Sequence, residues 1–135
     1  MEVKITDNSE VFKNAKDEAV QRALEAIGLT AERHAKERCP VDTGRLRNSI
    51  THATSQYKGQ GTYADNQGNG FSDAYAQGEP EKNAVYIGTN VEYARIQELS
   101  DSYHHASGAA HFLRDAATTH GDEYRRIAEI QLKKG

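Results

Sequence analysis

The stretch CPVDTGRLRNSI, residues 39–50, separates a long helical pattern from a β-rich middle segment. Pro40 has no backbone N–H to donate, and its ring disfavours the helical conformation of the residue before it. The preceding helix is therefore expected to end at Arg38 or Cys39. We predict that the chain changes direction here.

The residues that follow suit a rigid corner. Asp42 and Thr43 offer side-chain oxygens that can cap a new turn, and Gly44 permits a backbone geometry that other residues resist. Leu46 lies between two arginines, so it can point inward while both guanidinium groups face outward. Ile50 then opens an extended segment.

The chain before the corner predicts a strand followed by a helix. Val3 and Ile5 alternate with polar residues, which indicates a short strand at a sheet edge. Apolar residues then recur every three or four positions from residue 11 to residue 35, the spacing of one helical stripe. We predict a helix over residues 9–38, with Gly28 marking a bend. At about 1.5 Å per residue it would be roughly 45 Å long, so part of it is expected to project towards a neighbour.

The middle of the chain alternates between strand and turn signals. Residues 49–57 predict a strand, and residues 84–88 predict a better one. Residues 56–83 are rich in glycine and polar side chains and predict a long mobile loop without regular structure. A turn at residues 89–90 suggests a hairpin, although the stretch from Ala94 fits a short helical turn equally well.

The last part of the chain predicts one helix that follows a Ser107 cap. Its apolar stripe runs from Leu113 to Ile130, is interrupted by Gly121 and ends beside two lysines. Together these elements predict a single α+β domain over residues 1–135. It would hold a small, mostly antiparallel sheet packed against a long N-terminal helix and a C-terminal helix, with a long Gly-rich loop.

Composition narrows the function classes. A net charge of -3 lacks the basic excess of proteins that grip nucleic acid through its phosphates. The single cysteine, Cys39, excludes an intramolecular disulfide and fits a reducing compartment. The first residues show no secretory signal, and the longest apolar run, residues 84–87, is too short to span a membrane. These features disfavour DNA binding and membrane insertion.

No pattern in the chain predicts a catalytic site. Asp42, Thr43 and Gly44 spell the D-T-G loop of aspartic proteases, which need two such carboxylates sharing a proton. Here proline precedes the string and arginines follow it, so we interpret it as the capped corner. Cys39 has no histidine near it in the sequence that could activate it, and we expect a small buried hydrophobe. We therefore expect a protein that is not an enzyme.

Six histidines raise the question of a metal site. His104, His105 and His111 form the densest cluster, but adjacent histidines on an extended chain point opposite ways, and neither cysteine nor carboxylate stands at ligand spacing around them. His34 and His120 lie on apolar helical stripes and are expected to be satisfied core or interface histidines. The sequence thus predicts neither a bound metal nor a cofactor.

Three blocks resemble the head-to-tail joining family of long-tailed bacteriophages, whose members are neck or minor tail components. The blocks are PVDTGRLRNSI from Pro40, VYIGTNVEYARIQE from Val85 and HFLRDA from His111. The chain departs from the family pattern at His111, where the family often has proline. The resemblance implies a structural part of the virion that is assembled in the bacterial host cytoplasm and carries no catalytic residue.

The resemblance further implies self-association into a ring at the head–tail junction, contacts with connector and tail proteins, DNA only as passing cargo and no membrane. The alternative is a monomeric prophage-encoded binding module that engages a host protein through residues 56–83. Arg45 and Arg47 could contact phosphates of DNA that passes through the ring or carboxylates of a neighbouring subunit. The surrounding acidity favours the carboxylates, with Glu92, Glu98 and Asp101 as candidate partners, and the loop aromatics are favoured anchors at an interface. The interface candidates are Asp42, Thr43, Gly44, Arg45, Leu46, Arg47, Tyr63, Phe71, Tyr75, Tyr93 and Glu98.

Overall fold

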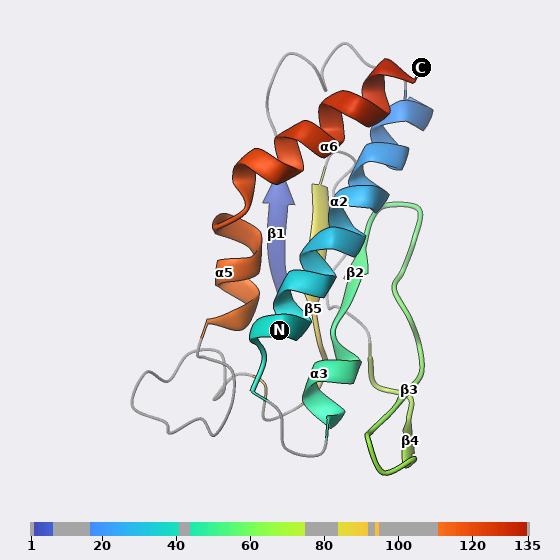
Figure 1. Ribbon diagram of the computed structural model, residues 1–135. Coiled ribbons are helices and arrows are strands. Elements are labelled where there is room, and N and C mark those ends of the chain that lie inside the picture. Colours follow the sequence, from blue (N-terminus) through green and yellow to red (C-terminus); the bar gives the residue numbers. More distant parts are fainter. Residues whose placement is uncertain are drawn as a thin grey trace.

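The computed structural model describes residues 2–6, 17–40, 44–74, 84–91, 94 and 111–134. Within these ranges the chain forms helices and a small antiparallel sheet, which confirms the predicted α+β class (Figure 1). The elements are β1 (Glu2–Thr6), α2 (Asp17–Arg38), α3 (Arg45–Ser49), β2 (Thr51–Ala53), β3 (Tyr63–Ala64), β4 (Gly70–Phe71), β5 (Ala84–Gly88), α5 (Phe112–Thr118) and α6 (Gly121–Lys133).

The main sheet has three antiparallel strands in the order β1-β5-β2. Val3 pairs with Ile87 and His52 also pairs with Ile87, so β5 is the central strand. The position of β1 at one edge confirms the edge strand predicted for the N-terminus. At the other edge, the backbone N–H of Gln60 donates to Thr51 Oγ1 at 3.0 Å, so the chain after β2 folds back over that edge.

The helices lie on one face of this sheet, with α2 and α6 crossing in front of it (Figure 1). One hydrophobic core joins α2, α3, β5, α5 and α6. The largest side chains that are fully buried in it include Phe112, Ile50, Ile87, Leu113 and Val85. Cys39 is buried and reduced, as expected of a small hydrophobe. Among the described residues, no helix is both long and apolar enough to cross a lipid bilayer.

The long helix α2 ends at Arg38, as Pro40 predicts, whereas the predicted start at residue 9 lies outside the described residues. Gly28 has a different role from the predicted bend. A Cβ atom there would lie 2.6 Å from His52 Cδ2 and 2.8 Å from Val85 Cγ2. The glycine therefore allows α2 to approach the sheet closely.

Two strand predictions for the chain after the corner are wrong. Both neighbours of β5 are already occupied, by β1 and β2, so the residues after Gly88 have no free edge of β5 to pair with. The alternative prediction, a short helical turn, is confirmed at Ala94. This residue is helical and donates its N–H to the carbonyl of Val91 at 3.1 Å. The predicted strand over 49–57 is likewise shortened to Thr51–Ala53, because α3 occupies the residues before it.

The predicted C-terminal helix is two helices, α5 and α6, which separate at Thr119 and His120. The Tyr124 hydroxyl donates to the carbonyl of Ala116 and so fixes the break. His111 caps α5 with a φ of 61°, a left-handed conformation. Proline fixes φ near -65°, so the proline of the family pattern could not adopt this backbone. The proposed Ser107 cap lies outside the described residues.

Candidate interaction surface

The corner begins with a short helix that starts at a glycine. Gly44 is the N-cap of α3, with φ at 85°, and a Cβ atom there would lie 2.5 Å from the Asn66 side chain. Both the left-handed backbone and the close approach require glycine. Among the described residues no side chain caps α3, and Asp42 and Thr43, the predicted caps, lie outside them. The start of a helix after Gly44 supports the interpretation of the D-T-G string as a corner.

The helix is fixed to the core from its inner face. Leu46 is only 4% exposed, as its predicted inward orientation requires. The Ser49 hydroxyl lies 2.6 Å from the carbonyl of Leu46 and 2.6 Å from the hydroxyl of Thr89, and both of these contacts are buried. Buried polar groups that are hydrogen-bonded in this way hold a helix end in one position. A partner could reach Leu46 only if the corner rearranged.

The outer face of α3 binds a hairpin from the Gly-rich segment. β3 and β4 pair through Tyr63 with Phe71 and Ala64 with Gly70. The prediction that residues 56–83 lack regular structure is therefore wrong for the described part, residues 56–74. The mobility of the segment remains a prediction.

Arg45 is the main link between α3 and the hairpin. Its guanidinium Nη2 lies 2.9 Å from Asp73 Oδ2, and its Nε donates to the Tyr63 hydroxyl at 3.3 Å. The guanidinium carbon also lies 4.4 Å from the centre of the Phe71 ring, a cation–π arrangement. The Tyr63 and Phe71 rings stack with their centroids 5.3 Å apart.

The Tyr63 hydroxyl completes this cluster by donating to Asp73 Oδ1 at 2.6 Å. Burial and this hydrogen bond raise the pKa of Tyr63 to about 12. The hydrogen bond from Tyr63, together with the guanidinium of Arg45, holds the pKa of Asp73 below its usual value. The carboxylate therefore stays charged and keeps both donors at neutral pH.

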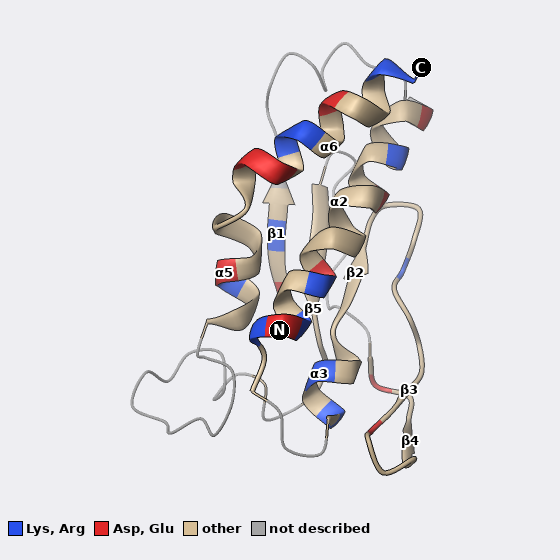
Figure 2. Cartoon of the chain, in the orientation of Figure 1, with Lys and Arg blue, Asp and Glu red and all other residues tan. Residues whose placement is uncertain are grey.

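Two further contacts tie the turn of the hairpin to α3. Asn48 Nδ2 donates to the carbonyl of Ala64 at 2.8 Å, and Arg47 Nη2 donates to Asn66 Oδ1 at 3.2 Å. The turn itself is stabilised by Asp65, whose carboxylate accepts the N–H groups of Gln67 and Asn69. Figure 2 marks basic positions on α3 and acidic positions in the hairpin segment, and Arg45 of α3 pairs with Asp73.

The exposed side of the hairpin carries a shallow open groove. It encloses about 420 Å³ and is lined by Thr62, Tyr63, Gly70, Phe71 and Ser72. Aromatic side chains with a polar rim are typical of surfaces that bind other proteins. We name this groove and the α3 arginines beneath it the corner surface.

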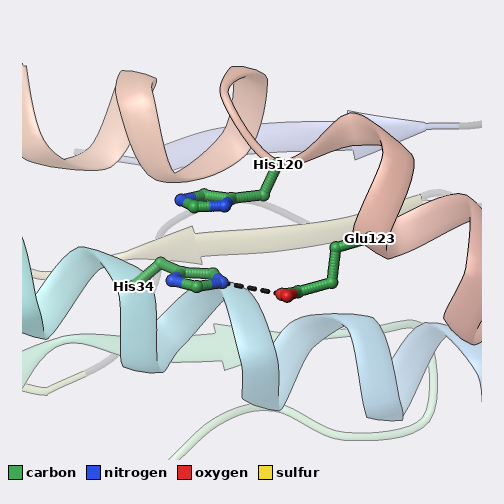
Figure 3. Close-up of side chains that lie close together, drawn as sticks. All are labelled: His34, His120 and Glu123. Carbon is green, nitrogen blue, oxygen red and sulfur yellow. Dashed lines mark hydrogen bonds and ion pairs between the residues drawn. The ribbon is translucent and has the colours of Figure 1, made fainter.

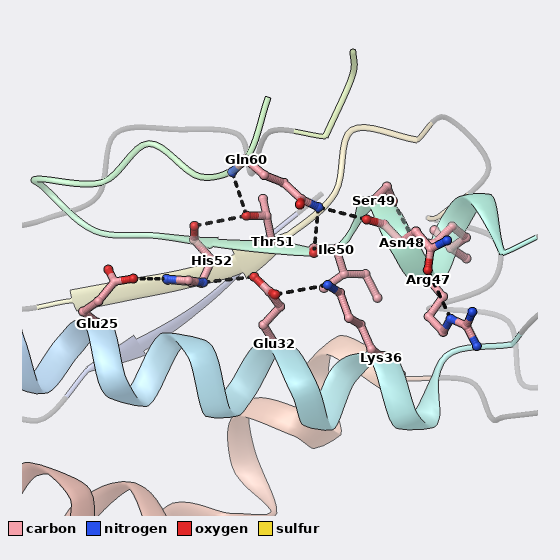
Figure 4. Close-up of polar contacts among 11 residues, drawn as sticks. Glu25, Glu32, Lys36, Arg47, Asn48, Ser49, Ile50, Thr51, His52 and Gln60 are labelled. Carbon is pink, nitrogen blue, oxygen red and sulfur yellow. Dashed lines mark hydrogen bonds and ion pairs between the residues drawn. The ribbon is translucent and has the colours of Figure 1, made fainter. Parts of the chain in front are cut away.

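A buried ionic network supports the corner from behind. His52 on β2 is 3% exposed, and its ring nitrogens lie 2.6 Å from Glu25 Oε1 and 3.0 Å from Glu32 Oε1, both on α2 (Figure 4). Lys36 continues the network to Glu32 at 3.1 Å. Burial alone lowers the pKa of His52, but the hydrogen bonds to both carboxylates outweigh it and raise that pKa above its usual value. The two carboxylates therefore favour the charged form of the imidazole, and His52 joins α2 to the sheet.

The structure brings together some of the residues predicted for an interface. Arg45, Arg47, Tyr63 and Phe71 meet at the corner surface, although 16 or more residues of sequence separate the arginines from the aromatic side chains. The other interface residues on these predicted segments lie outside the described residues. They are the candidates Tyr75, Tyr93 and Glu98 and the proposed partners Glu92 and Asp101.

Sequence analysis missed Asp73, the carboxylate that Arg45 contacts within the same chain. The polar loop offered no local signal for it, because a contact across 28 residues depends on how the segment folds back. The predicted pairing of Arg45 with a neighbouring subunit must therefore compete with an ion pair inside the chain.

One protein family matches most of this chain. A family model described as "HK97-gp10_like: Bacteriophage HK97-gp10, putative tail-component" matches residues 4–99. That range includes α2, the corner, the hairpin and β5. No match was found among curated proteins or among solved structures.

Proposed function

The chain belongs to the HK97-gp10-like family of bacteriophage tail components, and from this membership we propose that it is a structural protein of the head–tail junction. It would self-associate into a ring, contact connector and tail proteins, and surround DNA only as passing cargo. Assembly would take place in the cytoplasm of the bacterial host. Such a role needs no catalysis.

The observation that carries this proposal is the extent of the family match. It covers residues 4–99, well over half of the chain, and includes every residue of the corner surface. α5 and α6 lie beyond it. The corner surface is thus part of the shared portion of the fold, which supports a role in contacts common to such tail components.

The mechanism would be geometric. In a ring, each subunit presents one surface to the next and a different surface to the previous one, and the ring closes only if the rotation per subunit permits it. The corner surface suits the first role, because hydrogen bonds from Arg45 of α3 and from Tyr63 to Asp73 tie its aromatic groove to the domain. A surface that is ordered before assembly loses less conformational entropy on binding.

The direct test is electron microscopy of an induced lysate in which the start codon of this gene has been removed. We expect filled heads that lie separate from finished tails, and joined particles when the gene is supplied in trans. Intact virions in the absence of the gene would contradict a role at the junction. They would favour instead the monomeric module that binds a host protein through residues 56–83.

The corner surface is tested by complementation with Thr62→Arg. Thr62 is exposed at the groove, so a long charged side chain would block a partner without disturbing the core. We expect a folded protein that fails to enter particles. Thr118→Arg on α5 is the matched control, because Thr118 is equally an exposed threonine but lies far along the chain from the groove. Equal incorporation of both variants would exclude this groove as an interface.

The variant Leu46→Asp is not a suitable test of the corner surface. Leu46 is 4% exposed in the core, so a buried carboxylate would destabilise the fold and would not report on an interface. Arg45→Glu would also change the fold and not only the surface, because the new carboxylate would repel Asp73 and release the hairpin.

A further inference from the structure

A cluster of two histidines and one glutamate lies at the junction of α2 with α6, away from the corner surface. His34 comes from α2, His120 is the N-cap of α6, and Glu123 lies in its first turn. One ligand atom from each residue lies within 4.8 Å of the others. Figure 3 shows the two imidazole rings facing each other, with Glu123 at their edge. It is the one such group of three among the residues that the structure describes.

The first sign that this cluster is a binding site is a buried atom without a partner. His120 Nε2 is inaccessible to solvent and makes no hydrogen bond within the described part of the chain. A buried polar atom left unpaired costs free energy, and a bound ion is one kind of group that can satisfy it. The His34 side chain, by contrast, bonds through Nε2 to Glu123 Oε1 at 2.7 Å.

The stacking of the two rings is the second sign. The His34 and His120 rings are parallel within 3°, and their centroids are 3.6 Å apart. Rings packed this closely bring imidazole nitrogens from α2 and from the N-cap of α6 together beside the Glu123 carboxylate. Imidazole nitrogen is a common metal ligand.

Charge at the cluster also suits a cation. Two arginines of α2 each lie 3.9 Å from a carboxylate outside the cluster, Arg33 from Glu37 and Arg38 from Asp115. Glu123 supplies a negative charge within the cluster itself. Glu37 also lies 3.8 Å from His34 Nδ1, where a carboxylate can orient a ligating imidazole.

We propose that His34, His120 and Glu123 bind a divalent cation of the zinc class, which would join α2 to the start of α6. Imidazole nitrogen with one carboxylate is a donor set that suits zinc and its neighbours, whereas calcium and magnesium prefer oxygen. Three protein ligands leave a fourth position. Since the Glu123 side chain is 44% exposed and that of His34 only 12%, this position faces solvent on the glutamate side.

Binding requires a small rearrangement. Parallel rings direct their lone pairs along parallel lines, so one ring must turn for both to meet the same ion. The terminal torsion of histidine is soft, and ligand atoms around tetrahedral zinc lie about 3.4 Å apart. The cluster would therefore contract slightly around the ion, and the metal would replace the proton shared by His34 and Glu123.

The test uses the untagged full chain, stripped with a chelator and titrated with Zn²⁺ by calorimetry and with Co²⁺ by visible absorption. We expect binding at about one ion per chain, tetrahedral Co²⁺ bands and a higher midpoint of thermal unfolding with Zn²⁺. His120→Gln and Glu123→Gln should each weaken Zn²⁺ binding at least about tenfold. If His120→Gln fails to fold, Glu123→Gln still decides the question, because the Glu123 side chain is 44% exposed and lies outside the hydrophobic core.

Two matched controls should bind Zn²⁺ as the wild type does. His52→Gln removes a buried histidine outside the cluster, and Glu129→Gln removes an exposed glutamate from the same helix. The proposal is overturned if micromolar Zn²⁺ does not bind, or if binding survives both cluster variants. It is equally overturned if the variant His104→Gln/His105→Gln abolishes binding instead.

Discussion

His52 is the residue on which the packing of α2 against the sheet depends most directly. It is 3% exposed between Glu25 and Glu32, and its raised pKa means that the folded state holds a proton more tightly than the unfolded chain. The stabilisation is therefore fully present below the unfolded pKa and is lost as the pH rises through the folded pKa.

The first prediction follows from the raised pKa of His52. His52→Gln should lower the free energy of unfolding by roughly 1–3 kcal/mol at about pH 6, because two carboxylates lose a buried donor. The loss should shrink as the pH rises past the folded pKa of His52. Urea unfolding of both proteins across this range measures it, and a pH-independent difference would show that the imidazole is not charged in the fold.

Gly28 gives a second prediction at the same scale. Alanine in place of a helical glycine usually stabilises by about 1 kcal/mol. At Gly28 the new Cβ would lie under 3 Å from His52 and Val85, so we expect Gly28→Ala to destabilise by roughly 1–3 kcal/mol. Gly121→Ala is the control, since nothing lies within 4 Å of its Cβ position. Equal thermal shifts for both variants would exclude close packing as the role of Gly28.

At the scale of elements, the hairpin β3–β4 depends on one helix of five residues. Its own pairing joins only two residues on each strand, and a two-stranded hairpin of this size is marginal in water. Arg45, Asn48 and the stacked aromatic rings supply the additional contacts.

We therefore predict that Arg45→Ala releases the hairpin without unfolding the domain. Amide hydrogen exchange at Asp65 and Asn69, whose N–H groups bond within the turn, should become roughly two- to tenfold faster. Exchange in α2 should not change. Arg47→Ala is the control on the same helix, because Arg47 reaches the hairpin through one exposed contact to Asn66. Unchanged exchange in Arg45→Ala would mean that the hairpin is held by other contacts.

At the scale of the whole molecule, α2, β5, α5 and α6 share one core. The helix pair after the family match is part of it, through Phe112, Leu113 and Tyr124. We predict a single cooperative thermal transition for residues 1–135, with equal calorimetric and van't Hoff enthalpies. Two resolved transitions would instead indicate that α5 and α6 unfold separately from the rest of the chain. That result would contradict the prediction of one domain.

The sequence alone determined the features that depend on neighbouring residues. Pro40 ended α2 at Arg38, alternation identified β1 and β5, and helical spacing identified the buried face of α2. In α6 the predicted stripe is only partly right, because Tyr124 is buried but Ile130 is 49% exposed. These signals are local, because backbone geometry and the period of side chains act over a few residues. The three quoted blocks also pointed to phage structural proteins, which the family match confirms.

Only the tertiary structure decided which distant groups meet. The order β1-β5-β2 removed the predicted hairpin after Gly88, and the fold of the polar loop supplied Asp73 to Arg45. His34 was correctly placed on the apolar face of α2, whereas the prediction for His120 is wrong, because His120 lies at the break between α5 and α6 and its Nε2 has no hydrogen-bond partner among the described residues. The stacking of the two rings with Glu123 beside them depends on how α2 crosses α6. The physical reason is the same in each case: contacts between distant residues form through burial of the shared core, which no short pattern in the sequence encodes.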